Sequence, residues 1–139
     1  MVTDKNVDVN PYRGTIYWDT INWEQVEQTV QRLQTRIVKA LKKNAFRQVK
    51  DLQRLLTKSL SARLLAVKRV TTNKGRKTPG VDGIIWTTQE QKIQAVHDLE
   101  KDIKTLPLRR IYIPKKNGKK RPISIASMLN RAQARLVIF

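Results

Sequence analysis

The 139-residue chain contains 29 Lys and Arg but only 11 Asp and Glu, which gives a net charge of +18 at neutral pH. A hydrophobic fraction of 40% allows a buried core and excludes a disordered basic tail. The length fits one domain, or a small domain with part of another. The chain has no Cys and a single His, His97, which argues against disulfides, thiolate metal sites and zinc.

The excess positive charge predicts a polyanionic partner. A compact domain with this charge repels itself, and a phosphate backbone offsets the repulsion while releasing counterions. We therefore expect nucleic acid, and RNA in particular. No apolar run is long enough to span a bilayer, and the N-terminus lacks a signal-peptide pattern, so we expect no membrane association. The expected compartment is the cytoplasm, in a nucleoid or ribonucleoprotein, or else an organelle.

Residues 1–19 have no sustained hydrophobic period, so we predict a flexible lead-in there. Residues 20–106 are predicted to form a helical domain. Asn22, with Gln25 three residues later, is a capping-box pattern at its start. Three apolar stripes at helical spacing follow, and we expect all of them to pack in the core. They are Val26, Val30, Leu33, Ile37 and Leu41; Phe46, Val49, Leu52, Leu55 and Leu56; and, after Ser59 or Ser61, Leu60, Leu64, Leu65, Val67 and Val70.

The polar faces of these helices carry many Lys and Arg among few acids. A solvated face more often mixes both signs, so this excess favours binding to an anionic partner. Residues 73–83 then form a Gly-rich loop, with Pro79-Gly80 predicted in the middle of a type II turn. Glycines let backbone N–H groups approach an anion, but a plain connector between helices explains the loop equally well. The loop lacks the ending of a P-loop.

A fourth helix is predicted from a capping box at Thr87 and Glu90 to near Pro107. Two β-prone runs, 109–114 and 121–125, flank Asn117-Gly118, which predicts a β-hairpin. Ser127 is expected to cap a last helix that carries Leu129, Ala132, Leu136 and Val137. The predicted fold class is α+β, with a mostly helical N-terminal part, a basic β-hairpin and a terminal helix.

The hairpin carries seven basic residues and no acid between Arg109 and Arg121. A projecting ribbon with such a tip suits the clamping of phosphates. The alternative is that edge lysines only prevent aggregation, for which one or two would be enough. Clustered carboxylates, which nucleotidyl transfer needs for two divalent metals, are missing; Asp98 and Asp102 share a helical face with Lys101 and Lys104 nearby. We therefore predict no catalytic residue and no metal ligand.

Several segments together resemble group II intron reverse transcriptase/maturases. They are Leu52–Leu56 with Ser59 and Ala62-Arg63, Ala66–Thr71, Thr78–Gly83, Arg109–Lys115 and Asn117–Pro122. The resemblance runs from about Trp23 to the C-terminus, and their order and spacing carry it. It implies a helical N-terminal extension over 20–106 and a truncated start of the polymerase fingers over 107–139.

The resemblance also implies roles for individual residues. In that family the extension binds the intron RNA, the loop matching 73–83 covers the template, and the fingers hairpin closes over template and nucleotide. Lys115 and Arg121 match positions expected to touch the nucleotide triphosphate. We therefore predict a set of basic residues that bind RNA or template: Arg63, Lys68, Arg69, Lys74, Arg76, Lys77, Arg109, Arg110, Lys116, Lys119, Lys120 and Arg131.

The chain also departs from the family pattern near its end. Ile123–Ala126 replaces Leu-Gly-Ile-Pro, Asn130 replaces an Asp, and Ala134 replaces a Gln, which puts nucleotide binding at Arg121 in doubt. The palm carboxylates, and the Mg²⁺ that they would hold, would follow residue 139. We therefore expect an RNA-binding segment, with a template-primer duplex as a further partner, that does not extend a primer alone.

Two other functions stay open. One is a truncated, maturase-derived structural or assembly subunit of a larger ribonucleoprotein or protein complex, with a protein partner at the C-terminal apolar residues Leu136, Val137, Ile138 and Phe139. The other is nonspecific DNA binding of the chromatin type, which predicts equal affinity for duplex DNA and RNA at physiological salt.

Overall fold

The computed structural model of the protein describes residues 17–101 and 103–138. In chain order these form a 3-10 helix, η1 (Trp18–Thr20), then α1 (Trp23–Lys42), α2 (Phe46–Lys58), α3 (Leu60–Thr72), α4 (Gln89–Asp98), β1 (Arg109–Pro114), β2 (Lys120–Ile125) and α5 (Met128–Ile138). This order confirms the predicted α+β class. The predicted lead-in lies outside the described residues up to residue 16.

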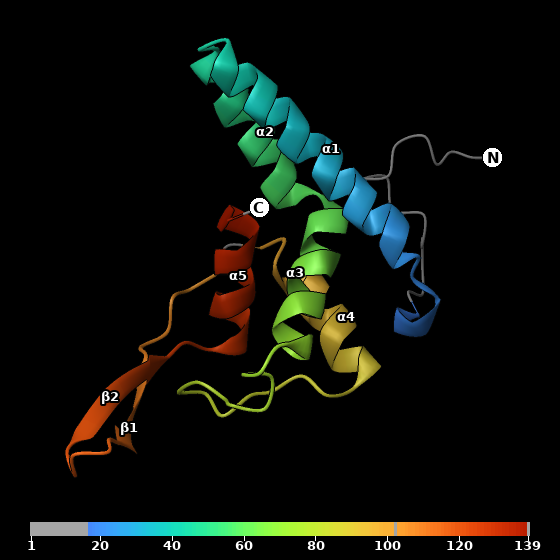
Figure 1. The fold of residues 1–139 in the computed structure, drawn as a ribbon. Coiled ribbons are helices and arrows are strands. Elements are labelled where there is room, and N and C mark those ends of the chain that lie inside the picture. Colours follow the sequence, from blue (N-terminus) through green and yellow to red (C-terminus); the bar gives the residue numbers. More distant parts are fainter. Residues whose placement is uncertain (1–16, 102, 139) are drawn as a thin grey trace.

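Two hairpins project from a helical body (Figure 1). α1 and α2 run antiparallel as a long helical hairpin, and α3, α4 and α5 form the body. The hairpin of β1 and β2 extends from the opposite end, and the loop of residues 73–83 lies at that same end of the body. None of the described helices combines the length and the apolar character needed to cross a membrane.

α3 is the centre of the core, because it packs against α1, α2, α4 and α5. Its side chains are buried on most sides; Ala62 and Val67 are fully buried and Leu64 is 1% exposed. A helix that is apolar on most of its faces needs several partners to cover it. Leu136 of α5 also belongs to this core at 4% exposure, which corrects the prediction of an exposed C-terminal edge there, whereas Val137 is exposed.

The outer end of the helical hairpin leaves apolar side chains in solvent. Leu41, Phe46 and Leu55 were predicted to be core residues, but they are 51%, 59% and 43% exposed. The reason is that only two helices meet there, so only a narrow seam is covered; its small core consists of Ala40, Val49 and Leu52. Asn44 ends α1 with a φ of 57°, a left-handed conformation that Asn tolerates better than most residues.

Side-chain caps start four of the helices. Asn22 Oδ1 accepts from Gln25 N–H at 3.2 Å and Ser59 Oγ from Ala62 N–H at 3.4 Å, as predicted. Ser127 caps α5 in the same way, by accepting from Asn130 N–H at 3.2 Å. The capping box of α4 lies one residue later than predicted, at Thr88 and Gln91. Gln91 Oε1 accepts from the Thr87 N–H group at 2.8 Å and from the Thr88 N–H group at 3.1 Å.

We expect replacement of Thr88 by Ala to destabilise the protein by about 1 kcal/mol, because the Gln91 N–H group loses its acceptor. Thr88→Ser keeps the hydroxyl and serves as the control, with a change of a few tenths of a kcal/mol. Urea unfolding followed by circular dichroism measures both. Equal stability of Thr88→Ala and Thr88→Ser would mean that this cap contributes nothing.

α4 ends at Asp98, well before the predicted end near Pro107. The following backbone is instead bonded by a side chain of α5. Asn130 Oδ1 accepts from Leu106 N–H at 3.0 Å, and its Nδ2 donates to Lys104 O at 3.3 Å. Tertiary bonds thus replace the helical ones, which the local sequence alone does not reveal.

The predicted β-hairpin is confirmed, with β1 and β2 antiparallel and Arg109 paired with Ile125. Gly118 takes a φ of 84° in the connecting turn. Lys115 N–H donates to Lys119 O, so this pair continues the hydrogen-bonded ladder. Bonded and non-bonded pairs alternate in such a ladder, so the Tyr112–Pro122 pair is non-bonded. Proline has no N–H group, and at this non-bonded position of the ladder Pro122 does not need one.

Candidate nucleic-acid interface

The β-hairpin presents its cations to solvent. All seven of its Lys and Arg residues are exposed, and none forms an ion pair within residues 17–101 and 103–138. Side chains alternate between the two faces of a strand. Arg109, Ile113 and its partner Arg121 therefore share one face. Lys115, two residues beyond Ile113 and bonded through its N–H to Lys119 O, falls on the same face. The two residues predicted to touch a triphosphate are thus placed together by the register.

The loop of residues 73–83 is folded by its own polar groups. Asn73 Oδ1 accepts from Gly75 N–H at 3.1 Å, and Thr78 N–H donates to Gly75 O at 3.0 Å. The predicted type II turn at Pro79-Gly80 is wrong, because Gly80 does not adopt a positive φ. The turn lies two residues later, where Gly83 N–H donates to Gly80 O at 3.1 Å.

Gly80 is needed for close packing against another segment, and not for the predicted turn. A Cβ at this position would lie 2.6 Å from the Ser127 backbone, so only glycine lets the loop rest directly on the start of α5. Arg109 Nη1 also donates to Pro79 O at 3.1 Å. The loop and the base of the hairpin therefore form one continuous surface, with Lys74, Arg76 and Lys77 exposed on the loop.

Three of the predicted RNA-binding residues are engaged within the protein instead. Arg63 is buried. Its Nη1 donates to Val96 O at 2.8 Å and lies 3.7 Å from Glu100 Oε2, so the side chain joins α3 to α4. Lys68 Nζ lies 4.7 Å from the ring centroid of Trp23, a cation–π contact. Arg131 is partly buried under the loop. Long aliphatic stems that cover apolar surface explain why a basic residue on a helix need not face solvent.

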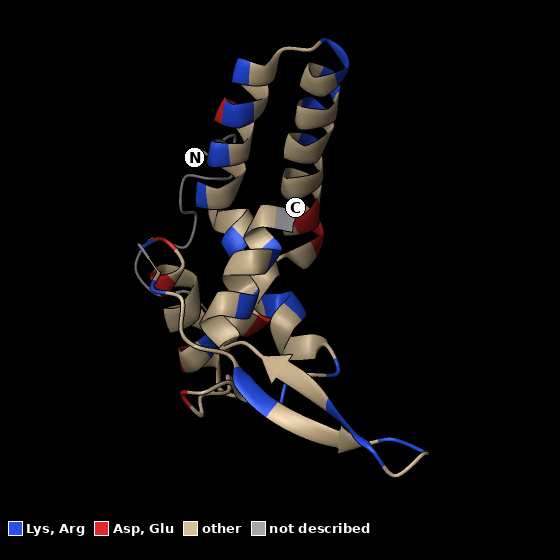
Figure 2. Ribbon diagram, turned by 90° about the vertical axis from the view of Figure 1, so that its left-hand side faces the viewer, with Lys and Arg blue, Asp and Glu red and all other residues tan. Residues whose placement is uncertain are grey.

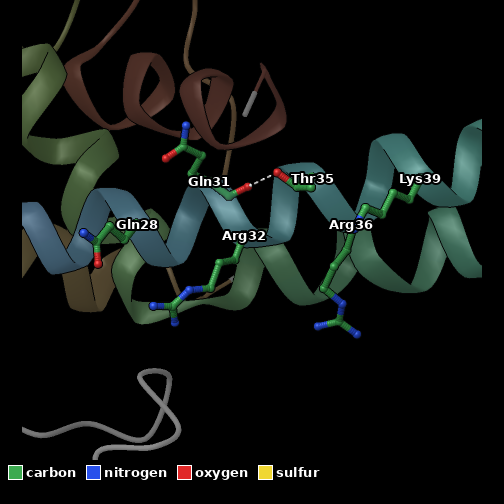
Figure 3. Close-up of a pocket in the computed structure, with 6 residues that line it drawn as sticks. All are labelled: Gln28, Gln31, Arg32, Thr35, Arg36 and Lys39. Atoms are coloured by element: carbon green, nitrogen blue, oxygen red, sulfur yellow. Dashed lines mark hydrogen bonds between the residues drawn. The ribbon is translucent and has the colours of Figure 1, made fainter.

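A second basic surface lies on α1, on one of the polar faces whose excess of Lys and Arg favoured an anionic partner, although its residues were not among those predicted to bind RNA. Six side chains of α1 border a shallow depression there (Figure 3). They are Gln28, Gln31, Arg32, Thr35, Arg36 and Lys39. Because all of them come from one helix, the surface is open. Arg32 and Arg36 project to the same side. The four-residue spacing on a predicted helix was the available signal, since it separates the two by about 6 Å along the axis.

Basic residues dominate both projecting ends of the molecule. Figure 2 shows Lys and Arg along the helical hairpin and at the tip of the β-hairpin, while the acidic residues lie mostly on the body between these two ends. Among the described residues no three His, Cys, Asp or Glu side chains gather as a metal site would require. The arrangement can hold phosphates at several separate points.

Comparisons with known proteins show which family the chain belongs to. A family model described as the N-terminal domain of reverse transcriptase matches residues 18–99, from η1 to the end of α4. The chain is also similar to Protein YkfC of Escherichia coli (strain K12), with 36% identity over 95 residues. That match covers 63% of this chain and 25% of the relative, so the chain spans about a quarter of the relative's length. The family match takes in all of α1–α4 and the loop of residues 73–83, and the chain therefore belongs to the family of reverse transcriptase N-terminal domains.

Proposed function

We propose that the protein is the RNA-binding N-terminal segment of a group II intron-encoded reverse transcriptase/maturase. The observation that supports this most is the joint surface of the loop of residues 73–83 and the β-hairpin. It gathers exposed cations, with Asp82 as the one acid of the loop and none on the hairpin, on two supports that are fixed to each other. Phosphate contacts provide most of the affinity for nucleic acid, and such a surface offers many of them.

The family match provides the second argument. A reverse transcriptase holds an RNA template, so basic surfaces on its N-terminal segment are expected to face RNA. In this proposal the loop and the hairpin contact the template, and the α1 surface with Arg32 and Arg36 contacts structured intron RNA. Lys115 and Arg121 remain candidates for the triphosphate. Any Mg²⁺ belongs to acidic residues outside the described ones.

Binding to a structured RNA and to duplex DNA of equal length tests the proposal. We expect the RNA to bind about tenfold or more tightly at 0.15 M salt, with a logarithmic affinity that falls linearly with the logarithm of salt concentration. Fluorescence anisotropy over 50–300 mM salt measures both quantities. Equal affinity for the two ligands would instead indicate nonspecific polyanion binding and would refute the proposed preference.

One observation favours the second candidate function, an assembly subunit. Leu41, Phe46 and Leu55 are exposed on the helical hairpin, and Val137 is 74% exposed on α5. Exposed apolar side chains of this size are typical of surfaces that bind protein. Purification from the native cell distinguishes the two candidates, since a stable protein partner without RNA supports the second one.

A further inference from the structure

Arg131 makes an unusual set of contacts in the first turn of α5. Its Nε donates to Ala126 O at 3.0 Å and its Nη1 to Gly75 O at 3.0 Å, while its Nη2 donates to Thr78 O. All three acceptors are main-chain carbonyl oxygens. Two of them belong to the loop of residues 73–83, more than fifty residues earlier in the chain.

The guanidinium group is suited to this geometry. It presents several N–H donors in a rigid plane, so a single side chain can reach three carbonyls that face it from different directions. Burial lowers the pKa of Arg131 from its ordinary value, and the Asp82 carboxylate partly offsets this effect. The residue keeps its charge at neutral pH, and a partly buried cation is stabilised by the carbonyl dipoles around it.

Gly80 provides an independent contact between the same two segments. An added Cβ would lie 2.6 Å from both the N and the Cα atom of Ser127 and 2.8 Å from the carbonyl carbon of Ala126. These are backbone atoms that cannot turn aside, so the loop would have to move. The loop is therefore fixed to the start of α5 by a side chain at one point and by close backbone contact at another.

We propose that Arg131 is a positioning residue, which holds the loop of residues 73–83 in the arrangement that binds RNA and does not itself contact phosphate. The inference rests on the proposed function, because the loop acts through its exposed residues Lys74, Arg76 and Lys77. Without the Arg131 contacts these three cations stay in the chain but no longer lie at fixed places beside the hairpin. They then contact fewer phosphates at once, because ordering the loop on binding costs free energy.

Two substitutions that keep the net charge separate positioning from direct contact. Arg131→Lys retains the cation, but one ammonium group cannot reach the three carbonyls. Gly80→Ala retains Arg131 and displaces the loop. Each phosphate contact to single-stranded RNA releases about 0.7 counterion and contributes roughly fourfold at 0.15 M salt. We expect both variants to lose about tenfold in affinity and to flatten the salt slope by about 1 to 2.

The controls use the same helix. Arg135 lies one turn further along α5, so Arg135→Lys tests a conservative change and Arg135→Ala the loss of one charge. We expect Arg135→Lys to bind as the wild type does. The double variant Arg131→Lys/Gly80→Ala should lose no more than either single variant, because both release the same loop.

The experiment uses the full chain, with a fluorescent RNA hairpin that carries a single-stranded overhang, together with amide hydrogen exchange of the free protein. Support consists of faster exchange within residues 73–83 in both variants together with the flattened salt slope. Wild-type affinity and slope in Arg131→Lys, with loss only in Arg131→Ala, would identify a direct phosphate contact and overturn the proposal. Unchanged exchange in the loop, or failure of both variants to fold, would overturn it too.

The exchange measurement also separates this inference from the proposed function. Should the wild type bind no RNA, the proposed function fails, and the positioning of the loop for RNA fails with it. Should the wild type bind RNA while the loop exchanges equally in all variants, only the inference about Arg131 fails.

Discussion

Replacement of Lys119 and Lys120 by Gln is expected to weaken RNA binding by about tenfold at 0.15 M salt, since each lost phosphate contact costs roughly fourfold. Both side chains are exposed at the end of the β-hairpin, and neither forms an ion pair among the described residues. The logarithmic salt slope should fall by about 1.4 for a single-stranded ligand. Fluorescence anisotropy against salt concentration gives both numbers.

The control is Lys101→Gln/Lys104→Gln, which removes the same charge from exposed positions after α4, although Lys101 Nζ also lies 3.9 Å from Asp98 Oδ1. It should leave the affinity within about twofold of the wild type, because distant charges are screened over about 8 Å at this salt concentration. Equal losses in the two double variants would mean that only net charge matters. That result would remove the hairpin from the proposed interface.

Replacement of Leu64 by Ala is expected to destabilise the protein by about 2–5 kcal/mol. Leu64 is 1% exposed on α3, where the four neighbouring helices meet, so the removed atoms leave a cavity that cannot collapse easily. Leu55→Ala on α2 is the control, because this side chain is 43% exposed and its loss should cost about 0.5 kcal/mol or less.

Urea unfolding measures the stability lost in each of the two variants, with the midpoint and the slope fitted together. A similar loss in Leu55→Ala would show that the exposed face of α2 is covered in solution, for example by a second copy of the chain. Concentration-dependent unfolding would then accompany it.

The sequence allowed the local features of the fold to be predicted. Asn22 and Ser127 were identified as caps because each is a short polar residue just before an apolar stripe, and Ser59, one of two serines considered at that point, is also a cap. Asn117-Gly118 located the hairpin because a left-handed turn residue was needed there. These signals act within a few residues, where bonding rules depend little on the rest of the molecule.

Long-range contacts determine the features of the fold and the site that could not be predicted from the sequence. The contact of Arg131 with Gly75 and Thr78, and that of Gly80 with Ser127, join segments that no periodicity relates. Arg63 was predicted to bind RNA because a basic residue on a helix usually faces solvent, but α4 covers it. Leu55 was predicted to be core because helical spacing shows which residues share a face, and not whether another element covers that face.

The bonds that Arg109 and Arg131 make to the loop all end on carbonyl oxygens of the main chain. Every residue type has such an oxygen, so these bonds do not depend on which side chains stand at positions 74 and 77. Arg76 differs, because its own Nη1 donates to Asn73 O at 3.3 Å. Exchanging Lys74 and Lys77 therefore changes the side chains that the loop presents to a ligand and leaves its hydrogen bonds to Arg109 and Arg131 unchanged.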